Sequence, residues 1–203
     1  MNCNGDCRAC PLMASKGNCI RVAVTWADES MKSRTVNCDG YQVRFNVLPE
    51  ISSILDTPTD LVLHIVDAMR LEDTLYPVTK LNDMDIKVII ALHNYEQYKA
   101  TGHTLDIRQL SRMLGMPVVV CDAEDPLGGI ELIGKIAEAA RQPFERKVSV
   151  PYGQDVEKAI SRIAAAFHQG HEPWLHFSER YVAVRLLEHQ DYIMPYVNSL
   201  PNA

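Results

Sequence analysis

Long apolar runs, a secretory leader and a clustered basic surface are all absent from this sequence. No apolar run approaches the roughly 18–20 residues that a membrane-spanning helix requires. The polar, cysteine-bearing N-terminus does not have the pattern of a signal peptide. A formal net charge of −6 argues against a nucleic-acid partner, because phosphate binding needs clustered Lys and Arg. We therefore expect a cytoplasmic protein with no nucleic-acid partner and no transmembrane segment in this chain.

The composition is that of an ordinary globular protein. The chain has 203 residues, of which 47% are hydrophobic and 23% charged. This length suffices for one domain of about 100–150 residues and a smaller appendage.

Four of the six cysteines lie in the first nineteen residues, with the spacing C-x3-C-x2-C-x8-C: Cys3, Cys7, Cys10 and Cys19. In a reducing compartment such clustering indicates metal or redox chemistry, and four thiolates suit either an Fe–S cluster or tetrahedral Zn²⁺. The alternative is a flexible tail with reduced thiols. C-x3-C-x2-C is also the spacing of radical S-adenosylmethionine enzymes, but the larger barrel and glycine-rich cofactor strand that they need are not evident.

Short apolar segments alternate with helical ones along the first two thirds of the chain. This pattern predicts an α/β domain with a mainly parallel sheet covered on both faces. The predicted strands are 20–26, 41–48, 61–66, 87–92 and 118–121, and the predicted helices are 70–84 (with Pro77 in the first turn or at a kink), 106–114 and 128–140.

The last sixty residues are amphipathic and contain no strand pattern. Residues 155–168, 178–188 and 191–200 are predicted helices that pack as a small unit on the first domain. The chain is thus divided into a Cys-rich putative metal-binding segment (1–19), an α/β domain (20–142) and a helical domain (143–203).

A series of short matches, in order, resembles the ferrous iron transport protein B family. The matches in the α/β part are Val66-Asp67-Ala68, Leu71-Glu72, Leu75-Tyr76, Ala91-Leu92 and Leu114-Gly115-Met116-Pro117-Val118. Those in the tail are Pro151-Tyr152-Gly153, Val156-Glu157-Lys158-Ala159-Ile160 and Leu186-Leu187-Glu188. The resemblance implies a P-loop-GTPase-like fold with a helical domain. In the family this region binds GTP and regulates Fe²⁺ passage through a membrane domain that follows it.

The phosphate-binding loop that the resemblance implies is degenerate. Such a loop needs glycines so that its backbone can wrap the phosphates, a Lys for their charge and a Ser or Thr for Mg²⁺. Lys32 and Ser33 fall in register with the Lys and the Ser or Thr of such a loop. However, Trp26 and Met31 replace its glycines, and Asp28 would repel phosphate. An exposed turn in which Lys-Ser is a coincidence is the favoured interpretation.

The two switch segments of the family are also altered. Between the loop and the strand at 41–48 we expect no room for a helix, a switch loop and another strand. The second switch, Asp-Leu-Pro-Gly in the family, corresponds to Val47-Leu48-Pro49-Glu50. Val47 cannot hold a magnesium-bound water, and Glu50 replaces the glycine that senses the γ-phosphate.

The guanine-recognition motif, Asn-x-x-Asp in the family, corresponds to His93-Asn94-Tyr95-Glu96. Glu96 is one methylene too long, and His93 lacks the donor and acceptor pair of an amide. A shifted pairing through Asn94 is a weaker alternative, and Ala123 still offers a backbone N–H in the last base-binding loop. We expect no tight GTP binding and no GTPase activity.

Three functions follow as hypotheses. The first is a non-enzymatic regulatory or docking module of ferrous iron uptake, peripheral to the inner membrane, whose partner is a membrane iron transporter subunit or a related protein. The second is a metal or redox protein carried by the N-terminal cysteines. The third is an atypical GTPase that uses Lys32, Ser33 and Glu96.

Overall fold

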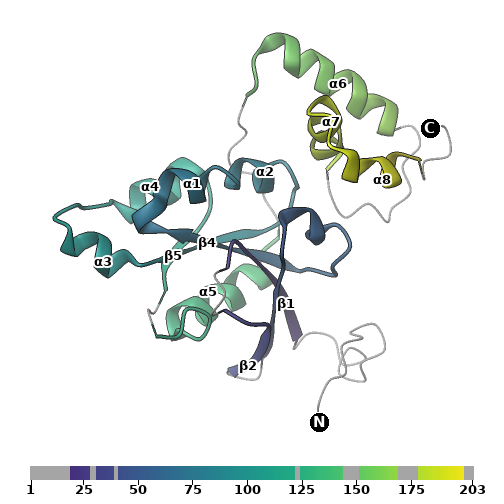
Figure 1. The fold of residues 1–203 in the computed structure, drawn as a ribbon. Coiled ribbons are helices and arrows are strands. Elements are labelled where there is room, and N and C mark those ends of the chain that lie inside the picture. The colour runs from purple at the N-terminus through teal and green to yellow at the C-terminus, as the bar shows by residue number, and fades with distance from the viewer. Residues whose placement is uncertain are drawn as a thin grey trace.

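In the part of the chain that the structure describes, three strands come first, strands and helices then alternate up to residue 141, and three α-helices follow. The computed structural model describes residues 19–27, 31–38, 41–121, 124–143, 151–168 and 178–198. Figure 1 shows an α/β domain and a separate helical unit formed by α6–α8.

Six strands form one sheet in the order β2-β3-β1-β4-β5-β6. All neighbouring pairs are parallel except β2 with β3, which is antiparallel. The strands are β1 (Cys19–Thr25), β2 (Arg34–Cys38), β3 (Tyr41–Val47), β4 (Leu61–Asp67), β5 (Val88–His93) and β6 (Val118–Val120). The α/β fold with a mainly parallel sheet is therefore confirmed.

The central strands are buried on both faces, which explains their continuous apolar sequences. Along β4, Leu61, Leu63 and Ile65 contribute to one hydrophobic core and Val62 and Val66 to the other. Alternate side chains of a strand point to opposite faces of the sheet, so each face of β4 needs its own covering layer.

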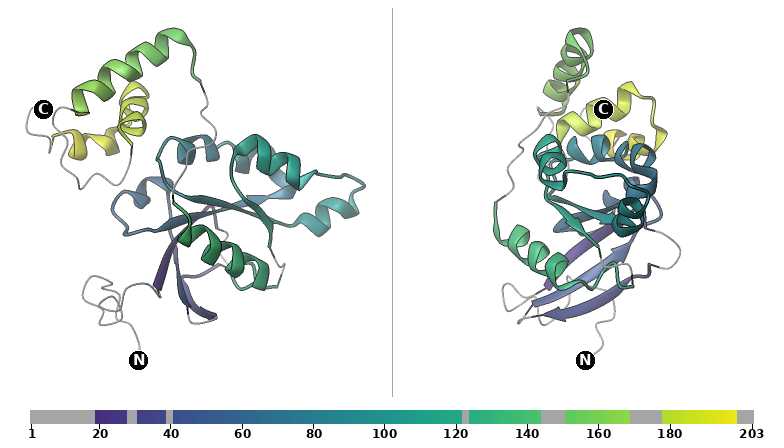
Figure 2. Two further views of the ribbon diagram at one scale, coloured as in Figure 1. Left: turned by 180° about the vertical axis from the view of Figure 1, so that it is seen from behind. Right: turned by 90° about the vertical axis from the view of Figure 1, so that its left-hand side faces the viewer.

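Helices supply both layers, as Figures 1 and 2 show. On one face, α5 (Ile130–Arg141) packs through Leu132, Ile133 and Ile136. The other face is covered by α1 (Leu71–Leu75), α2 (Val78–Asn82), α3 (Tyr95–Ala100) and α4 (Ile107–Leu114). The prediction for 106–114 is confirmed, because Asp106 caps the N-terminus of α4 and Gly115, with φ 66°, ends it.

Two sequence-based expectations need correction. Residues 70–84 do not form one helix: Pro77, which lacks an amide hydrogen, separates α1 from α2, and a 3-10 turn (Ala68–Arg70) precedes them. The predicted strands also omitted one, which lies before Tyr41. This is β2, which pairs with β3 at the edge of the sheet, where polar residues are tolerated. No helix accompanies it in the described residues between β1 and β3, as expected.

The helical unit consists of α6 (Gln154–His168), α7 (Glu179–Leu187), a 3-10 turn (Asp191–Ile193) and α8 (Met194–Asn198). Figure 2 shows it at one end of the α/β domain. Tyr181, Val182 and Ile193 extend the second hydrophobic core across this junction. The helical unit is therefore anchored on the α/β domain and shares part of its core.

A buried carboxylate, that of Asp83, joins the two parts. Asp83 directly follows α2 and is only 1% exposed. Its carboxylate accepts a hydrogen bond from the Tyr152 hydroxyl (2.7 Å) and one from Arg180 Nε (3.2 Å), and it lies 3.8 Å from Arg185 Nη2. The Ser178 hydroxyl donates to the Asp83 carbonyl and also accepts from the Tyr181 amide, so it caps α7 and fixes that helix to the α/β domain.

Glu157 extends the bonds around Asp83 toward the surface through Arg180. Its carboxylate accepts two hydrogen bonds from the Arg180 guanidinium, at 2.7 and 2.8 Å. These bonds, followed by one from the Tyr152 amide, lower the pKa of Glu157 to about 2. Burial, and then the bond to Asp83, raises the pKa of Tyr152 to about 12.

Neutralising Asp83 is expected to destabilise the whole chain. Asp83→Asn leaves the buried Arg185 and the half-buried Arg180 with less compensating charge, and breaking a buried pair typically costs about 3–5 kcal/mol. At roughly 2–4 °C per kcal/mol for a chain of this size, thermal unfolding should show Tm lower by about 10 °C. Asp155→Asn is the matched control, because Asp155 is 97% exposed and pairs with Lys158 at the surface. Equal Tm values for the two variants would contradict a joining role for Asp83.

Candidate functional site

The carboxyl ends of the parallel strands are where open α/β sheets bind ligands, and the described positions of the nucleotide motifs lie at or next to these ends. The first is the connection after β1. Only eight residues, 26–33, separate the end of β1 from the start of β2. A phosphate-binding loop leads from a strand into the N-terminus of a helix, and eight residues are too few for both.

Lys32 and Ser33 end this connection, and both are exposed. The Ser33 hydroxyl accepts a hydrogen bond from the Val47 amide (2.9 Å). Next to it, the Leu48 amide donates to the Val24 carbonyl (2.9 Å). Ser33 thus ties the start of β2 to the end of β3, which is a structural use of its hydroxyl.

Residues 47–50, the counterpart of the second switch, lead into a 3-10 turn (Ile51–Ile54). The Glu50 carboxylate accepts a hydrogen bond from the Ser52 hydroxyl (3.0 Å), so it folds back on its own turn. Leu48 and Ile51 pack against the second core. This segment is held by packing and by local hydrogen bonds.

The guanine-recognition positions lie at the end of β5. His93 is the last residue of that strand, opposite Asp67 on β4. Asn94 has a left-handed backbone (φ 57°), and its amide donates to the Asp67 carboxylate (3.1 Å). Glu96 is 74% exposed and pairs with Lys99 one helical turn away (2.7 Å). Asn94 and Glu96 are therefore bonded to neighbouring side chains, and Ala123 lies outside the described residues.

The face of the sheet that α5 covers is closed near β1 by loops. Met31, from the β1–β2 connection, and Leu127, from the loop after β6, are both buried in the first core. Arg34, at the start of β2, forms an ion pair with Asp125 of the same loop. Gly128 lies beneath this pair, where an added Cβ would meet the Asp125 carboxylate at 2.1 Å. Loop residues therefore pack next to α5 on this face of the sheet.

A buried histidine lies beneath the end of β1, and sequence reasoning did not single it out. His64 on β4 accepts a hydrogen bond at Nδ1 from the Thr25 hydroxyl (2.8 Å) and donates from Nε2 to the Thr74 carbonyl (2.9 Å). Burial lowers the pKa of His64, so the ring stays neutral and both of its bonds are satisfied. Its ring centroid lies 6.3 Å from that of Trp26.

The predicted metal ligands fall largely outside the described residues. Cys3, Cys7 and Cys10 lie there, whereas Cys19 begins β1 and is half-buried. Within the described ranges, no group of three His, Cys, Asp or Glu side chains is arranged to hold a metal ion. Cys121 is buried in the first core, where it packs among apolar side chains, and burial raises its pKa to about 12.

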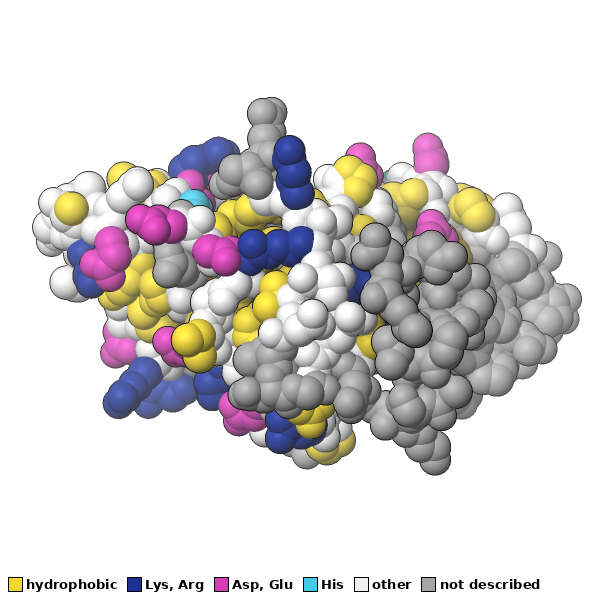
Figure 3. All heavy atoms as spheres, turned by 90° about the horizontal axis from the view of Figure 1, so that it is seen from below, with side chains coloured by type: hydrophobic (Ala, Val, Ile, Leu, Met, Phe, Trp, Pro, Cys, Tyr) yellow, Lys and Arg dark blue, Asp and Glu magenta, His cyan; other side chains and the backbone are white. Residues whose placement is uncertain are grey.

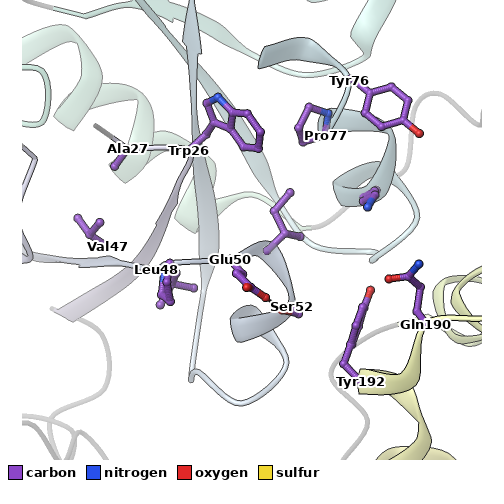
Figure 4. Close-up of a pocket in the computed structure, with 13 residues that line it drawn as sticks. Trp26, Ala27, Val47, Leu48, Glu50, Ser52, Tyr76, Pro77, Gln190 and Tyr192 are labelled. Carbon is purple, nitrogen blue, oxygen red and sulfur yellow. Dashed lines mark hydrogen bonds between the residues drawn. The ribbon is translucent and has the colours of Figure 1, made fainter. Parts of the chain in front are cut away.

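A pocket of about 760 Å³ opens where the end of β1 meets the helical unit (Figure 4). We call it the seam pocket because both parts of the chain line it. Its walls come from the end of β1, the turn after β3, the junction of α1 and α2, and the segment before α8. The lining residues are Trp26, Ala27, Val47, Leu48, Pro49, Glu50, Ile51, Ser52, Tyr76, Pro77, Lys80, Gln190 and Tyr192.

Outside the pocket, the face shown in Figure 3 carries mixed charge. Lys and Arg side chains lie there among Asp and Glu side chains and do not form a continuous basic surface. Among the helices that the structure describes, none is both long and apolar enough to span a bilayer.

Two family models match the chain, one in each part. A model described as "Ferrous iron transport protein B" matches residues 50–136, and one described as "FeoB cytosolic helical domain" matches residues 152–202. The chain thus matches the FeoB family in both of its domains. The match to the FeoB G domain begins at residue 50, after the β1–β2 connection and the end of β3.

Named relatives agree with this match. An Fe(2+) transport protein A/Fe(2+) transporter FeoB fusion protein of Porphyromonas gingivalis W83 is 30% identical over 148 residues, which are 72% of this chain and 18% of that protein. The Fe(2+) transporter FeoB of Helicobacter pylori J99 is 28% identical over 147 residues, or 66% of this chain and 22% of that protein. The chain thus spans about a fifth of the length of these two FeoB relatives.

Solved FeoB structures share the fold. The apo cytosolic domain of Thermotoga maritima FeoB superposes with a TM-score of 0.75 at 22% identity, covering 91% of this chain and 88% of that one. A mutant of S. thermophilus NFeoB bound to GMPPNP superposes with a TM-score of 0.70 at 20% identity. The match covers 87% of this chain and 82% of that one. The predicted G-domain-like architecture with a C-terminal helical domain is confirmed.

Proposed function

We propose that this chain is a FeoB-like pseudo-GTPase that serves ferrous iron uptake as a regulatory or docking module in the cytoplasm. The observation that carries the proposal is the eight-residue β1–β2 connection, whose Ser33 hydroxyl is bonded to the Val47 amide. Phosphoryl transfer depends on positioned charge around the phosphates. This connection contains no glycine, and no helix begins in its described residues.

Three further features support the loss of nucleotide chemistry. Glu50 bonds to Ser52, Asn94 bonds to Asp67, and Glu96 pairs with Lys99. Each of these positions, which correspond to nucleotide contacts in the family, is thus bonded within this chain. The start of the family match at residue 50 agrees with the same interpretation.

The first test is nucleotide binding. Isothermal titration of the full chain with GTP and with GDP in Mg²⁺ should give no binding heat at micromolar concentrations, because tight phosphate contacts are missing. Binding with Kd of about 1 μM, worth about 8 kcal/mol, would refute the pseudo-GTPase proposal. If the chain is instead an atypical GTPase, Lys32→Ala should weaken that binding and Lys135→Ala should not, since Lys135 lies on α5 and pairs with Glu138.

The docking role predicts a specific partner. We infer that this partner is the membrane iron transporter, because the FeoB relatives are Fe²⁺ transporters several times the length of this chain. The tagged chain should therefore elute in one complex with the detergent-solubilised Fe²⁺ transporter of its own organism, with or without GTP. Separate elution of the two at micromolar concentrations would contradict docking.

A metal centre at the N-terminus is a second proposed function. It rests on the density of cysteines in residues 1–19, which suits an Fe–S cluster or Zn²⁺. After anaerobic purification, elemental analysis should find about one zinc, or iron with matching acid-labile sulfide and visible absorbance, per chain.

The variants Cys7→Ser and Cys10→Ser should lose this metal, because each removes a thiolate ligand. Cys121→Ala should retain it, since that thiol is buried in the first core. A metal-free protein, or a metal retained in both serine variants, would contradict the proposed centre.

A further inference from the structure

The seam pocket has the size and the setting of a ligand site. Its volume of about 760 Å³ is within the range of roughly 300–1,000 Å³ that is typical of small-molecule pockets. It lies at a junction of two domains, a common position for such sites. Bonds between the domains are present near it: the Tyr196 hydroxyl donates to the Asp56 carboxylate, and Asp83 bonds to Tyr152 and Arg180.

Aromatic and proline rings supply much of the wall. Figure 4 shows Trp26, Pro77 and Tyr76 on one side of the pocket and Tyr192 on the other. Trp26 is 47% exposed and Tyr76 is 68% exposed, so two large rings face solvent beside the cavity. A flat, apolar ligand between these walls would remove aromatic surface from water.

Trp26 has an unfavourable backbone conformation. Its φ is 62°, in the left-handed region, which is costly for a non-glycine residue. Burial recovers little of this cost, because nearly half of the indole remains exposed. Strain of this kind tends to collect at ligand sites, and here the strained residue places an aromatic ring at the pocket.

The pocket is lined by one cation and one anion, and the two do not form an ion pair with each other. Among the thirteen lining residues, Lys80 is the one cation and Glu50 the one anion. Glu50 is exposed and already accepts a hydrogen bond from Ser52. Lys80 is half-buried, and its ammonium group forms no ion pair or hydrogen bond with any part of the chain that the structure describes. Within the described residues, the Lys80 ammonium is therefore available to pair with an anionic group of a ligand.

We propose that the seam pocket binds a small aromatic acid, with the ring between Trp26 and Tyr192 and the carboxylate on Lys80. Such a ligand would contact the α/β domain and the helical unit at once. This inference goes beyond the proposed function and does not depend on whether the chain binds nucleotides or a transporter.

The probe for the test is 2-naphthoate, with uncharged 2-naphthylmethanol as its matched analogue. Naphthoate has about thirteen heavy atoms, and at roughly 0.3 kcal/mol per atom we expect Kd of about 1 mM. In ¹H–¹⁵N spectra of the full chain, naphthoate should saturably shift the signals of the Trp26 indole and of the backbone amides of Leu48, 50–52 and 190–192. The alcohol should bind about tenfold more weakly, because it lacks the charge-assisted bond to Lys80.

Three variants separate the contribution of the Lys80 charge to binding from that of the Trp26 ring. Lys80→Gln should bind acid and alcohol equally, because the ammonium is removed. Trp26→Gly should stay folded, since glycine suits φ 62°, but should bind both probes several-fold more weakly. Ile130→Ser should bind like the parent chain, because Ile130 is 89% exposed at the start of α5 and does not line the pocket.

Three results would overturn the proposal. It falls if naphthoate produces no saturable shifts at several times the expected Kd, or if the shifts lie away from the pocket. It also falls if Lys80→Gln keeps the preference for the acid. A pocket that only a protein partner fills would give the first of these results. Failure here would leave the nucleotide and transporter tests unaffected.

Discussion

The arrangement of the two domains depends on one buried carboxylate. Asp83 follows a helix of the α/β domain, and its partners Tyr152, Arg180 and Arg185 all come from the helical part of the chain. The desolvation of a carboxylate and of Arg185 is costly and is offset only when their geometry is maintained. The junction is therefore specified by directional bonds as well as by apolar packing. The position of the seam pocket depends on this junction, because Gln190 and Tyr192 of the helical unit form part of its wall.

The edge of the sheet that carries the nucleotide-motif positions is stabilised by contacts within the chain. The strands and α5 are held by the two hydrophobic cores, and neither core requires a phosphate-binding loop. Met31 and Leu127 complete the first core where the connection after β1 is short. Ser33 and Asn94 are parts of local hydrogen-bond networks. A polar group that is not needed for a ligand stays compatible with the fold if it finds a partner within the chain.

The sequence predicted the fold well where local pattern determines it. The continuous apolar sequence of β4 and the capping residues Asp106 and Gly115 each carry a local signal. Strand β2 was missed because Arg34, Thr35 and Asn37 are polar, as befits an edge strand. The helix expected over 70–84 divides at Pro77. The site was less predictable, because the bonds of Asp83 to Arg180 and Arg185 and the walls of the seam pocket join residues far apart in the sequence.

The brief β1–β2 connection also has a consequence for how the chain folds. Parallel strands usually need a crossover of a dozen or more residues that contains a helix. Here β1 and β3 pair in parallel through a crossover formed by β2 itself, within residues 26–40. Closing so small a loop costs little chain entropy, and low contact order favours early pairing. The edge β2-β3-β1 is thus well placed to form first and to serve as the template onto which β4 and the later strands assemble.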